Sequence, residues 1–385
     1  MTQLSTLSSA APVAGDAAFM DRALELAAQG AALASPNPMV GAVLVRDERV
    51  VAEGFHTYQG VRHAEIVALE GAGESARGAT LYVTLEPCSH TGRTGPCVKA
   101  IVAAGVARVV AAMADPNPAV SGSGFEQLRA AGIRVSTGIR EEQARRLNEA
   151  FAWWIVSKKP LVTLKCALTL DGQLVLPRAP RKARGRPPQR WITSSESRAE
   201  VQRMRHQSDA LVTGIGTVLT DDPLLTDRTG LPRRRRLLRV VMDSRLRLPL
   251  RSRLVRSVQE DVLVFTCADE RSAKARALAR AGVEVVRLPR GGARLPLEAA
   301  VRELGRREIL SVLLEAGGIL NRAALEAEIV DKVRVFFAPK IAGFAGGPRG
   351  SSHFRGLSTL TDLSVARFSD DFAVEGYLRD VYRTR

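Results

Sequence analysis

The chain has 385 residues, of which 45% are apolar, and a net charge of +16 from 56 basic and 40 acidic residues. This length suits two domains of ordinary size, and no apolar run approaches the ~18 residues that a membrane-spanning helix needs. The charge could indicate nucleic-acid binding, but two basic runs, residues 178–190 and 233–236, are typical of solvated loops. We therefore favour surface charge and an anionic small-molecule substrate.

The first half of the chain alternates predicted helices and strands. Helices are expected at residues 17–30, 63–70, 98–104, 125–131 and 141–154. Strands are expected at residues 40–45, 50–53, 79–85, 106–113 and 133–137. Polar residues gather after the carboxyl ends of these strands, which predicts an α/β/α sandwich with its site at that edge of the sheet.

The pattern breaks at residues 157–160, Ser-Lys-Lys-Pro. We therefore expect a flexible leader at residues 1–16, a first domain at 17–156 and a second at 157–385. Strands of the second domain are expected at residues 161–168, 210–213, 237–242, 262–266, 283–288, 310–314 and 332–337. Helices are expected at residues 195–205, 270–281, 296–306 and 318–327. The strands are continuously apolar, which is typical of a buried, mostly parallel sheet.

A metal site is indicated by His63, Cys88 and Cys97, with Glu65 two residues after the histidine. One imidazole and two thiolates fill three tetrahedral positions on Zn²⁺ and leave the fourth for water, whose pKa the metal lowers. Glu65 suits proton transfer better than metal binding. This His-x-Glu…Pro-Cys…Cys order is that of zinc deaminases, which attack an amino-bearing ring carbon. The second cysteine follows the first by nine residues rather than three, and it opens a helix whose dipole favours the Cys97 thiolate.

The alternative is that these are ordinary core or surface residues. Against it, three of the five histidines and two of the four cysteines lie between residues 56 and 97. The other thiols, Cys166 and Cys267, fall in predicted strands, so a disulfide framework is not expected and a reducing cytoplasm fits. Residues 1–16 lack a basic start followed by an apolar block, which excludes a secretory signal.

In the second half, no G-x-G-x-x-G fingerprint opens a βαβ unit, because Gly214-Ile215-Gly216 lacks the third glycine. Residues 214–223 and 315–318 each leave a strand through small residues, which would let a phosphate approach a helix N-terminus. On either segment alone, a glycine-rich turn without such a role is the favoured interpretation.

These motifs carry a resemblance. Residues 63–65, 86–97 and 115–118 resemble the deaminase half of the bifunctional riboflavin-biosynthesis deaminase/reductase family, and residues 165–172, 191–194, 214–223 and 315–318 resemble its reductase half. The resemblance implies a cytidine-deaminase-like first domain and a dihydrofolate-reductase-like second domain. It also implies zinc-dependent deamination of 2,5-diamino-6-(5-phosphoribosylamino)pyrimidin-4(3H)-one, then NADPH reduction of 5-amino-6-(5-phosphoribosylamino)uracil to the ribitylamino product.

The resemblance also assigns residues. In the deaminase half it implies Zn²⁺ on His63, Cys88 and Cys97, with Glu65 as the catalytic acid and base. Substrate contacts are expected from Asn37, His56, His90, Arg93, Asp115 and Asn117, of which His56 and Arg93 suit the phosphate.

In the reductase half it implies contacts with NADPH from Ala167, Trp191, Thr217, Asp221, Ser244, Gly317, Gly318, Ile319, Leu320, Asn321, Arg322 and Ala323. It implies substrate contacts from Lys165, Gln189, Arg205, Leu225, Arg228 and Glu315. Arg205 and Arg228 suit the ribose phosphate. Lys165 and Asp221 are candidates for positioning the opened ribose. Gln189 stands where the family has a serine, inside a long basic Pro-rich loop of residues 177–190.

Three alternatives remain open. The chain could be a working deaminase with an altered or inactive reductase half. It could be an RNA- or nucleotide-directed deaminase, although the second half would then have no role. It could be a non-catalytic assembly protein, against which the intact zinc motif argues. For the favoured function we expect a phosphoribosyl pyrimidine as the binding partner, no nucleic acid, no membrane, and a homo-oligomer.

Overall fold

The computed structural model describes residues 15–90, 95–174, 191–289, 295–342 and 358–382. These residues form two compact units. Unit 1 contains the described residues up to Ser157 together with Pro232–Arg235, and unit 2 contains Lys158–Leu231 and the described residues from Arg236 onward. Across the described ranges, no helix combines the length and the apolar character that a bilayer crossing needs.

Unit 1 is built on a five-stranded sheet with the order β2-β1-β3-β4-β5. Its strands are β1 (Gly41–Arg46), β2 (Arg49–Phe55), β3 (Thr80–Val83), β4 (Arg108–Ala111) and β5 (Arg134–Thr137). β1 and β2 lie where strands were predicted at residues 40–45 and 50–53, and they pair antiparallel as a hairpin. β1 also pairs antiparallel with β3, whereas β3, β4 and β5 run parallel. The parallel strands deliver their following loops to one edge of the sheet.

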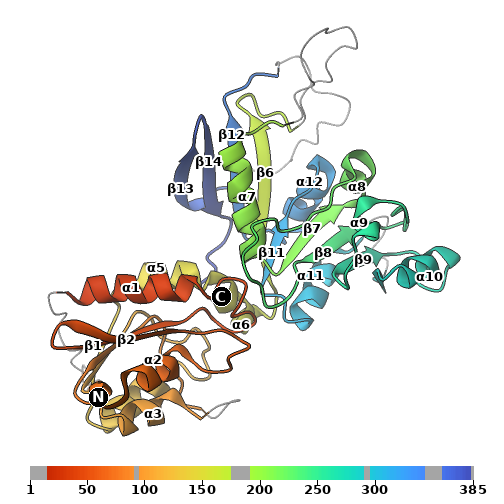
Figure 1. Cartoon of the computed structure of the whole chain (residues 1–385). Helices are drawn as coiled ribbons and strands as arrows, with labels where there is room; N and C mark the ends of the chain where they lie inside the picture. The colour runs from red at the N-terminus through yellow and green to blue at the C-terminus, as the bar shows by residue number, and fades with distance from the viewer. Residues whose placement is uncertain (1–14, 91–94, 175–190, 290–294, 343–357, 383–385) are drawn as a thin grey trace, which may run out of the picture. The chain divides into compact units, whose positions relative to one another are not determined.

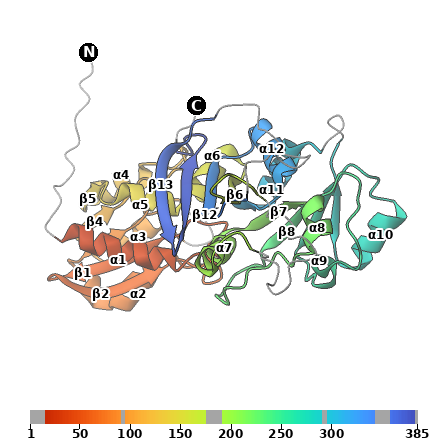
Figure 2. The ribbon, with the colours of Figure 1, turned by 90° about the horizontal axis from the view of Figure 1, so that it is seen from above.

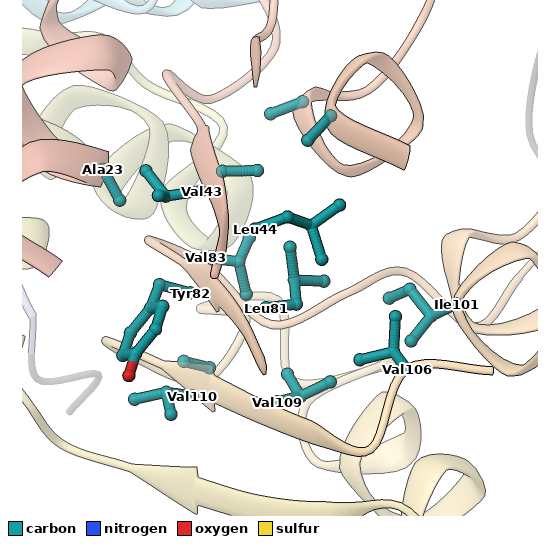
Figure 3. Packing of buried hydrophobic residues seen from close by; sticks show 14 of the residues in the cluster. Ala23, Val43, Leu44, Leu81, Tyr82, Val83, Ile101, Val106, Val109 and Val110 are labelled. Carbon is teal, nitrogen blue, oxygen red and sulfur yellow. The ribbon is translucent and has the colours of Figure 1, made fainter. Parts of the chain in front are cut away.

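Helices cover both faces of this sheet, which confirms the predicted sandwich (Figure 1). They are α1 (Asp16–Ala28), α2 (Ala64–Ala72), α3 (Cys97–Ala103), α4 (Ser123–Ala130), α5 (Glu141–Leu147) and α6 (Glu149–Ser157), with a short 3-10 helix at Gly73–Ala76. Figure 3 shows how the side chains alternate: Val43 lies beside Ala23 of α1, whereas Leu44 and Leu81 lie on the opposite face, toward Ile101 of α3.

The approach of α2 to β2 is unusually close, and Gly54 makes it possible. A Cβ at this position would lie 2.4 Å from the Ala64 carbonyl oxygen and 2.9 Å from the Ala68 nitrogen. Both atoms belong to the backbone of α2 and cannot move aside alone. Because Gly54 has no side chain, the first turns of α2 can pack directly on β2, and these turns carry the predicted histidine ligand and Glu65.

Two sequence predictions in unit 1 need correction. Asp16 was assigned to a flexible leader, but its side chain is 2% exposed and accepts hydrogen bonds from Arg108 and from the Tyr82 hydroxyl. Residues 141–154 were expected to form one helix, but Asn148 separates α5 from α6. Its side chain accepts from the Met39 N–H at 2.8 Å and donates to the Met39 carbonyl at 2.9 Å, so a contact distant in sequence decides the break.

Unit 2 contains a nine-stranded sheet with the order β10-β9-β8-β7-β11-β6-β12-β14-β13. Its strands are β6 (Leu161–Thr169), β7 (Ala210–Gly214), β8 (Leu238–Met242), β9 (Val262–Thr266), β10 (Glu284–Arg287), β11 (Ser311–Leu314), β12 (Lys332–Ala338), β13 (Thr361–Phe368) and β14 (Asp371–Tyr377). All strands from β6 to β12 are parallel, as predicted. The hairpin of β13 and β14 adds two antiparallel strands beyond β12 (Figures 1 and 2).

Helices of unit 2 pack on both faces of this sheet. They are α7 (Ser195–Gln207), α8 (Ile215–Asp221), α9 (Arg253–Arg256), α10 (Ala273–Arg280), α11 (Leu297–Arg306) and α12 (Gly318–Glu326). α11 and α12 share one core with the strands, through Leu304 and Ala324, and α8, α9 and α10 share another, through Val218, Leu254 and Leu278. The helices α8 and α9 and the hairpin of β13 and β14 were not predicted.

Candidate active sites

Three potential metal ligands converge at the carboxyl edge of the unit 1 sheet. His63 is the N-cap of α2, Cys88 lies in the loop after β3, and Cys97 is the first residue of α3. The Cys97 N–H donates to the Cys88 sulfur at 3.3 Å, and the Val98 N–H donates to the Cys88 carbonyl. The N-terminus of α3 therefore holds the Cys88 loop in place.

The distances between these side chains fit one tetrahedral zinc ion. The His63 Nδ1 atom lies 3.1 Å from the Cys97 Sγ atom and 3.4 Å from the Cys88 Sγ atom. All three ligand atoms lie within 4.8 Å of one another. Tetrahedral geometry at ordinary Zn–N and Zn–S bond lengths places such N and S atoms about 3.6 Å apart. One histidine and two cysteines are also a ligand set that zinc accepts, with a fourth position left open.

The two thiols differ in their electrostatic surroundings. Hydrogen bonds from the Cys97 thiol, from His63 and from the Cys97 N–H lower the pKa of Cys88 to about 4. The same contact with Cys88, together with burial, raises the pKa of Cys97. The N-terminus of α3, which was expected to favour the thiolate of Cys97, donates its first N–H to the Cys88 sulfur and so also stabilises the thiolate of Cys88.

Glu65 occupies the first turn of α2, as predicted, beside the ligand cluster. Its side chain is only 3% exposed, and burial raises its pKa. Hydrogen bonding with the Cys97 thiol and attraction to His63 oppose this shift. A buried carboxyl group with a raised pKa suits proton transfer in both directions.

Two of the predicted substrate residues, Asn37 and His56, contact each other beside this cluster. The His56 Nδ1 atom lies 2.8 Å from the Arg62 carbonyl oxygen, so it carries the proton, and the Nε2 atom accepts from the Asn37 amide at 3.0 Å. Burial lowers the pKa of His56, and its ring packs edge-on against His63 at 5.4 Å. A phosphate contact would require one of these hydrogen bonds to break, so the structure favours a neutral, positioning role for His56.

The loop after β4 brings Asp115 and Asn117 to the same edge of the sheet. The Asn117 N–H donates to the Asp115 carboxylate at 2.8 Å. Burial raises the pKa of Asp115, and its carboxyl group also interacts electrostatically with Cys88 and with the exposed His90. Arg93, the other predicted phosphate contact, lies outside the described residues.

Glu86 was not among the predicted site residues. Its side chain is 5% exposed, and its carboxylate accepts three backbone N–H groups from residues 115, 122 and 124. The only feature of the sequence that could have indicated a role for Glu86 is its position directly before Pro87-Cys88.

In unit 2, three predicted substrate residues gather around the carboxylate of a fourth, Glu315. Glu315 directly follows β11, and its oxygens accept two parallel hydrogen bonds from Arg205 of α7, at 2.7 and 2.9 Å. Burial by itself would raise the pKa of Glu315, but Arg205, and then Lys165 and Arg228, hold it below its usual range. Arg205 also donates to the Thr226 carbonyl, whereas Arg228 is exposed.

The predicted cofactor residues follow the carboxyl ends of adjacent strands. Ser244 follows β8, Thr217 and Asp221 lie in α8 after β7, and residues 317–323 begin α12 after β11. The strands β8, β7 and β11 are adjacent in the sheet, and β6, which carries Ala167, lies next to β11. Two helix N-termini at this edge suit the phosphates of a dinucleotide.

The structure also shows the surroundings of three other residues that were predicted to contact NADPH or the substrate. Trp191 is 52% exposed, and its carbonyl oxygen accepts from Lys340. Asn321 is buried and donates to Cys166 Sγ and the Ala316 carbonyl. Leu225 is 5% exposed and belongs to the core, so only its backbone is available for a ligand.

Gln189 and the Pro-rich loop of residues 177–190 lie outside the described residues. All four cysteines are free thiols, as expected.

Comparison with protein families matches both halves of the chain. Residues 14–113 match the cytidine and deoxycytidylate deaminase zinc-binding region, and residues 160–374 match the RibD C-terminal domain. The fold and the site thus define a zinc-dependent deaminase fused to a reductase, whose chemistry implies a nicotinamide cofactor.

Similar proteins identify the family. The chain is 41% identical over 328 residues to riboflavin biosynthesis protein RibD of Aquifex aeolicus, covering 85% of this chain and 88% of that protein. It is 40% identical over 366 residues to RibD of Escherichia coli, covering 92% and 95%. The chain belongs to the RibD family. It is a bifunctional deaminase and reductase of riboflavin biosynthesis.

The chain is also similar to solved structures of proteins of this family. RibD of Acinetobacter baumannii, form 1, superposes with a TM-score of 0.78 at 35% identity, covering 94% of this chain and 99% of that one. A Thermotoga maritima diaminohydroxyphosphoribosylaminopyrimidine deaminase/5-amino-6-(5-phosphoribosylamino)uracil reductase superposes with a TM-score of 0.77 at 38% identity, covering 94% and 98%.

Proposed function

We propose that the chain catalyses two successive reactions. Unit 1 hydrolytically deaminates 2,5-diamino-6-(5-phosphoribosylamino)pyrimidin-4(3H)-one, and unit 2 reduces the resulting 5-amino-6-(5-phosphoribosylamino)uracil with NADPH to the ribitylamino product. The observation that carries the first reaction is the buried Glu65 carboxyl beside the His63, Cys88 and Cys97 cluster. The name of the Thermotoga maritima relative supports the choice of substrates.

In the deaminase half, His63, Cys88 and Cys97 would hold a zinc ion, which would supply a water of lowered pKa for attack on the ring. Glu65 accepts a proton from the attacking water and returns it to the departing amino group. Its burial excludes bulk water from that transfer. Asn37, held by His56, and the loop with Asp115 and Asn117 form the surroundings in which we place the pyrimidine.

In the reductase half, NADPH supplies the hydride, and the protein orients the reactants. We assign the phosphate of the substrate to Arg228, because this side chain is exposed whereas Arg205 is held by Glu315. The Arg205–Glu315 pair and Lys165 would then face the opened ribose. We place NADPH along α8 and α12, at the ends of β7 and β11.

We further propose that the enzyme works in the cytoplasm, self-associates and needs no nucleic acid. The free thiols suit a reducing compartment. Retention on RNA that persists at ordinary ionic strength would contradict the last point.

The proposal for the deaminase is tested by Glu65→Gln. The amide keeps the size of the side chain but cannot carry the proton, so we expect one zinc per chain to remain while ammonia release falls by at least about 10²-fold. Glu70→Gln is the matched control, because Glu70 lies on the same helix, is exposed and pairs only with Arg62 among the ion pairs described. Unchanged turnover in the Glu65 variant would refute the assignment.

A further inference from the structure

A single buried carboxylate connects the two loops that form the edge of the deaminase site. Glu86 lies between the end of β3 and Cys88, and it is 5% exposed. Its Oε2 atom accepts from the Asp115 N–H at 3.0 Å and from the Gly122 N–H at 2.9 Å. Its Oε1 atom accepts from the Gly124 N–H at 2.8 Å. The donors belong to the α4 loop, residues 112–122, and to the first turn of α4.

These contacts replace a local helix cap. The N-cap of α4 is Gly122, which has no side chain, and its backbone is left-handed with φ 86°. The carboxylate of Glu86 comes from a position 36 residues before the N-cap. It satisfies the Gly124 N–H, which a serine or aspartate N-cap would otherwise serve, and the N–H of Gly122 itself, which the third helical residue of a capping box would serve. Negative charge is also favoured at this end of a helix. The α4 loop is therefore attached to the loop of a zinc ligand as well as to its own helix, where the Ser123 N–H donates to the Val120 carbonyl.

The start of α4 also packs directly against Glu86 and Pro87, with no room for a side chain at Gly124. A Cβ on Gly124 would lie 2.2 Å from the Pro87 carbonyl oxygen and 3.1 Å from the Glu86 Oε1 atom. The Ser89 and Ser123 hydroxyl groups also hydrogen-bond across the same gap. The α4 loop thus cannot shift without moving the segment that carries Cys88.

The α4 loop carries two of the predicted substrate residues. Glu86 holds the backbone of Asp115, and the Asp115 carboxylate in turn holds the Asn117 N–H. The Asn117 side chain accepts from the Ala119 N–H at 3.2 Å. A chain of hydrogen bonds therefore runs from Glu86 through both residues, and Asp115 lies within electrostatic reach of Cys88.

We propose that Glu86 is a positioning residue of the deaminase half, which sets the affinity for the substrate by holding the α4 loop against the Cys88 loop. This proposal rests on the proposed deaminase function. Glu86 uses its charge on backbone N–H groups and takes no part in proton transfer, so its loss should weaken substrate binding more than it slows the chemistry.

The test compares Glu86→Gln with the parent enzyme. The amide nitrogen cannot accept a hydrogen bond, so at least one of the three backbone N–H groups loses its partner. We expect KM for deamination to rise about 10- to 100-fold, with kcat within about threefold and zinc still at one per chain. Backbone amides of residues 115–124 should exchange with deuterium faster, and reductase activity should not change.

Two further variants complete the design. Gly124→Ala disturbs the same contact from the opposite side without any change of charge, and it should raise KM in the same way. Glu126→Gln is the matched control, because Glu126 lies in the first turn of the same helix but is exposed, and its KM should not change.

An unchanged KM in both Glu86→Gln and Gly124→Ala would overturn the proposal, and so would loss of zinc in Glu86→Gln, which would make Glu86 a support of the metal site alone. A parent enzyme that releases no ammonia would instead refute the proposed function. The deuterium exchange would then still decide whether Glu86 holds the loop.

Discussion

The pair of Arg205 and Glu315 offers a quantitative test of the reductase site. Their side chains are 12% and 13% exposed, and they share two parallel hydrogen bonds. Arg205→Met leaves the Glu315 carboxylate largely buried without its principal partner. Breaking a buried ion pair by removing one member costs about 3–5 kcal/mol. For a domain of this size that corresponds to a fall in Tm of roughly 10 °C.

The dependence on pH supplies an independent check. In the parent, Arg205 helps to hold the pKa of Glu315 below its usual range, so Glu315 stabilises the fold above its unfolded pKa, and this stabilisation is lost as the pH falls through the folded pKa. In Arg205→Met, burial dominates and raises the pKa of Glu315. The difference in Tm between parent and variant should therefore narrow as the pH falls from 7 toward about 5.

Arg205→Met/Glu315→Leu separates stability from function. Replacing both members of a buried pair by apolar groups is often neutral for stability, so the Tm should recover most of its loss. Reductase activity should be lost in both the single and the double variant, because both groups belong to the proposed substrate site. Deaminase activity is the internal control, since unit 1 has its own core. An unchanged Tm in the single variant, or a double variant that reduces substrate normally, would refute this reasoning.

Three further predictions concern stability and the metal. Burial raises the pKa of Asp331 from 3.8 to about 6, so the folded state holds a proton that the unfolded state has lost. Stability should therefore fall by about 2 kcal/mol between pH 4 and 6, and Asp331→Asn should flatten this slope in urea unfolding; an unchanged slope would contradict it. Gly54→Ala should displace α2 and lower the zinc content and ammonia release together. Dialysis against a chelator should abolish ammonia release but spare NADPH oxidation on the deaminated substrate; loss of both would show that the halves are not chemically separate.

The zinc cluster could be predicted because its signal is local in the sequence. His63 and Glu65 needed only to fall at the start of a helix, and Cys97 only at the start of another, for the geometry to follow. The parallel sheet of unit 2 was also predictable, because its strands are buried on both faces and read as continuous apolar runs.

The missed features depend on contacts that no local pattern reveals. β13 is exposed along nearly its whole length, so it carries no apolar run, and it was not predicted. The helix break at Asn148 depends on Met39, and the burial of Asp16 depends on Arg108. Glu86 likewise acts on N–H groups 29 to 38 residues away. For Asn148, Asp16 and Glu86, a polar side chain meets a backbone or charged partner that only the fold brings close.

The central claim, that one chain carries both activities, is tested most directly by following ammonia and NADPH in one reaction. Purified enzyme with the diaminopyrimidine substrate should release ammonia whether or not NADPH is present. With NADPH present, its oxidation should follow ammonia release and reach an equal amount. Ammonia release without NADPH oxidation would contradict the account, because the second unit would then have the fold of the reductase without its chemistry.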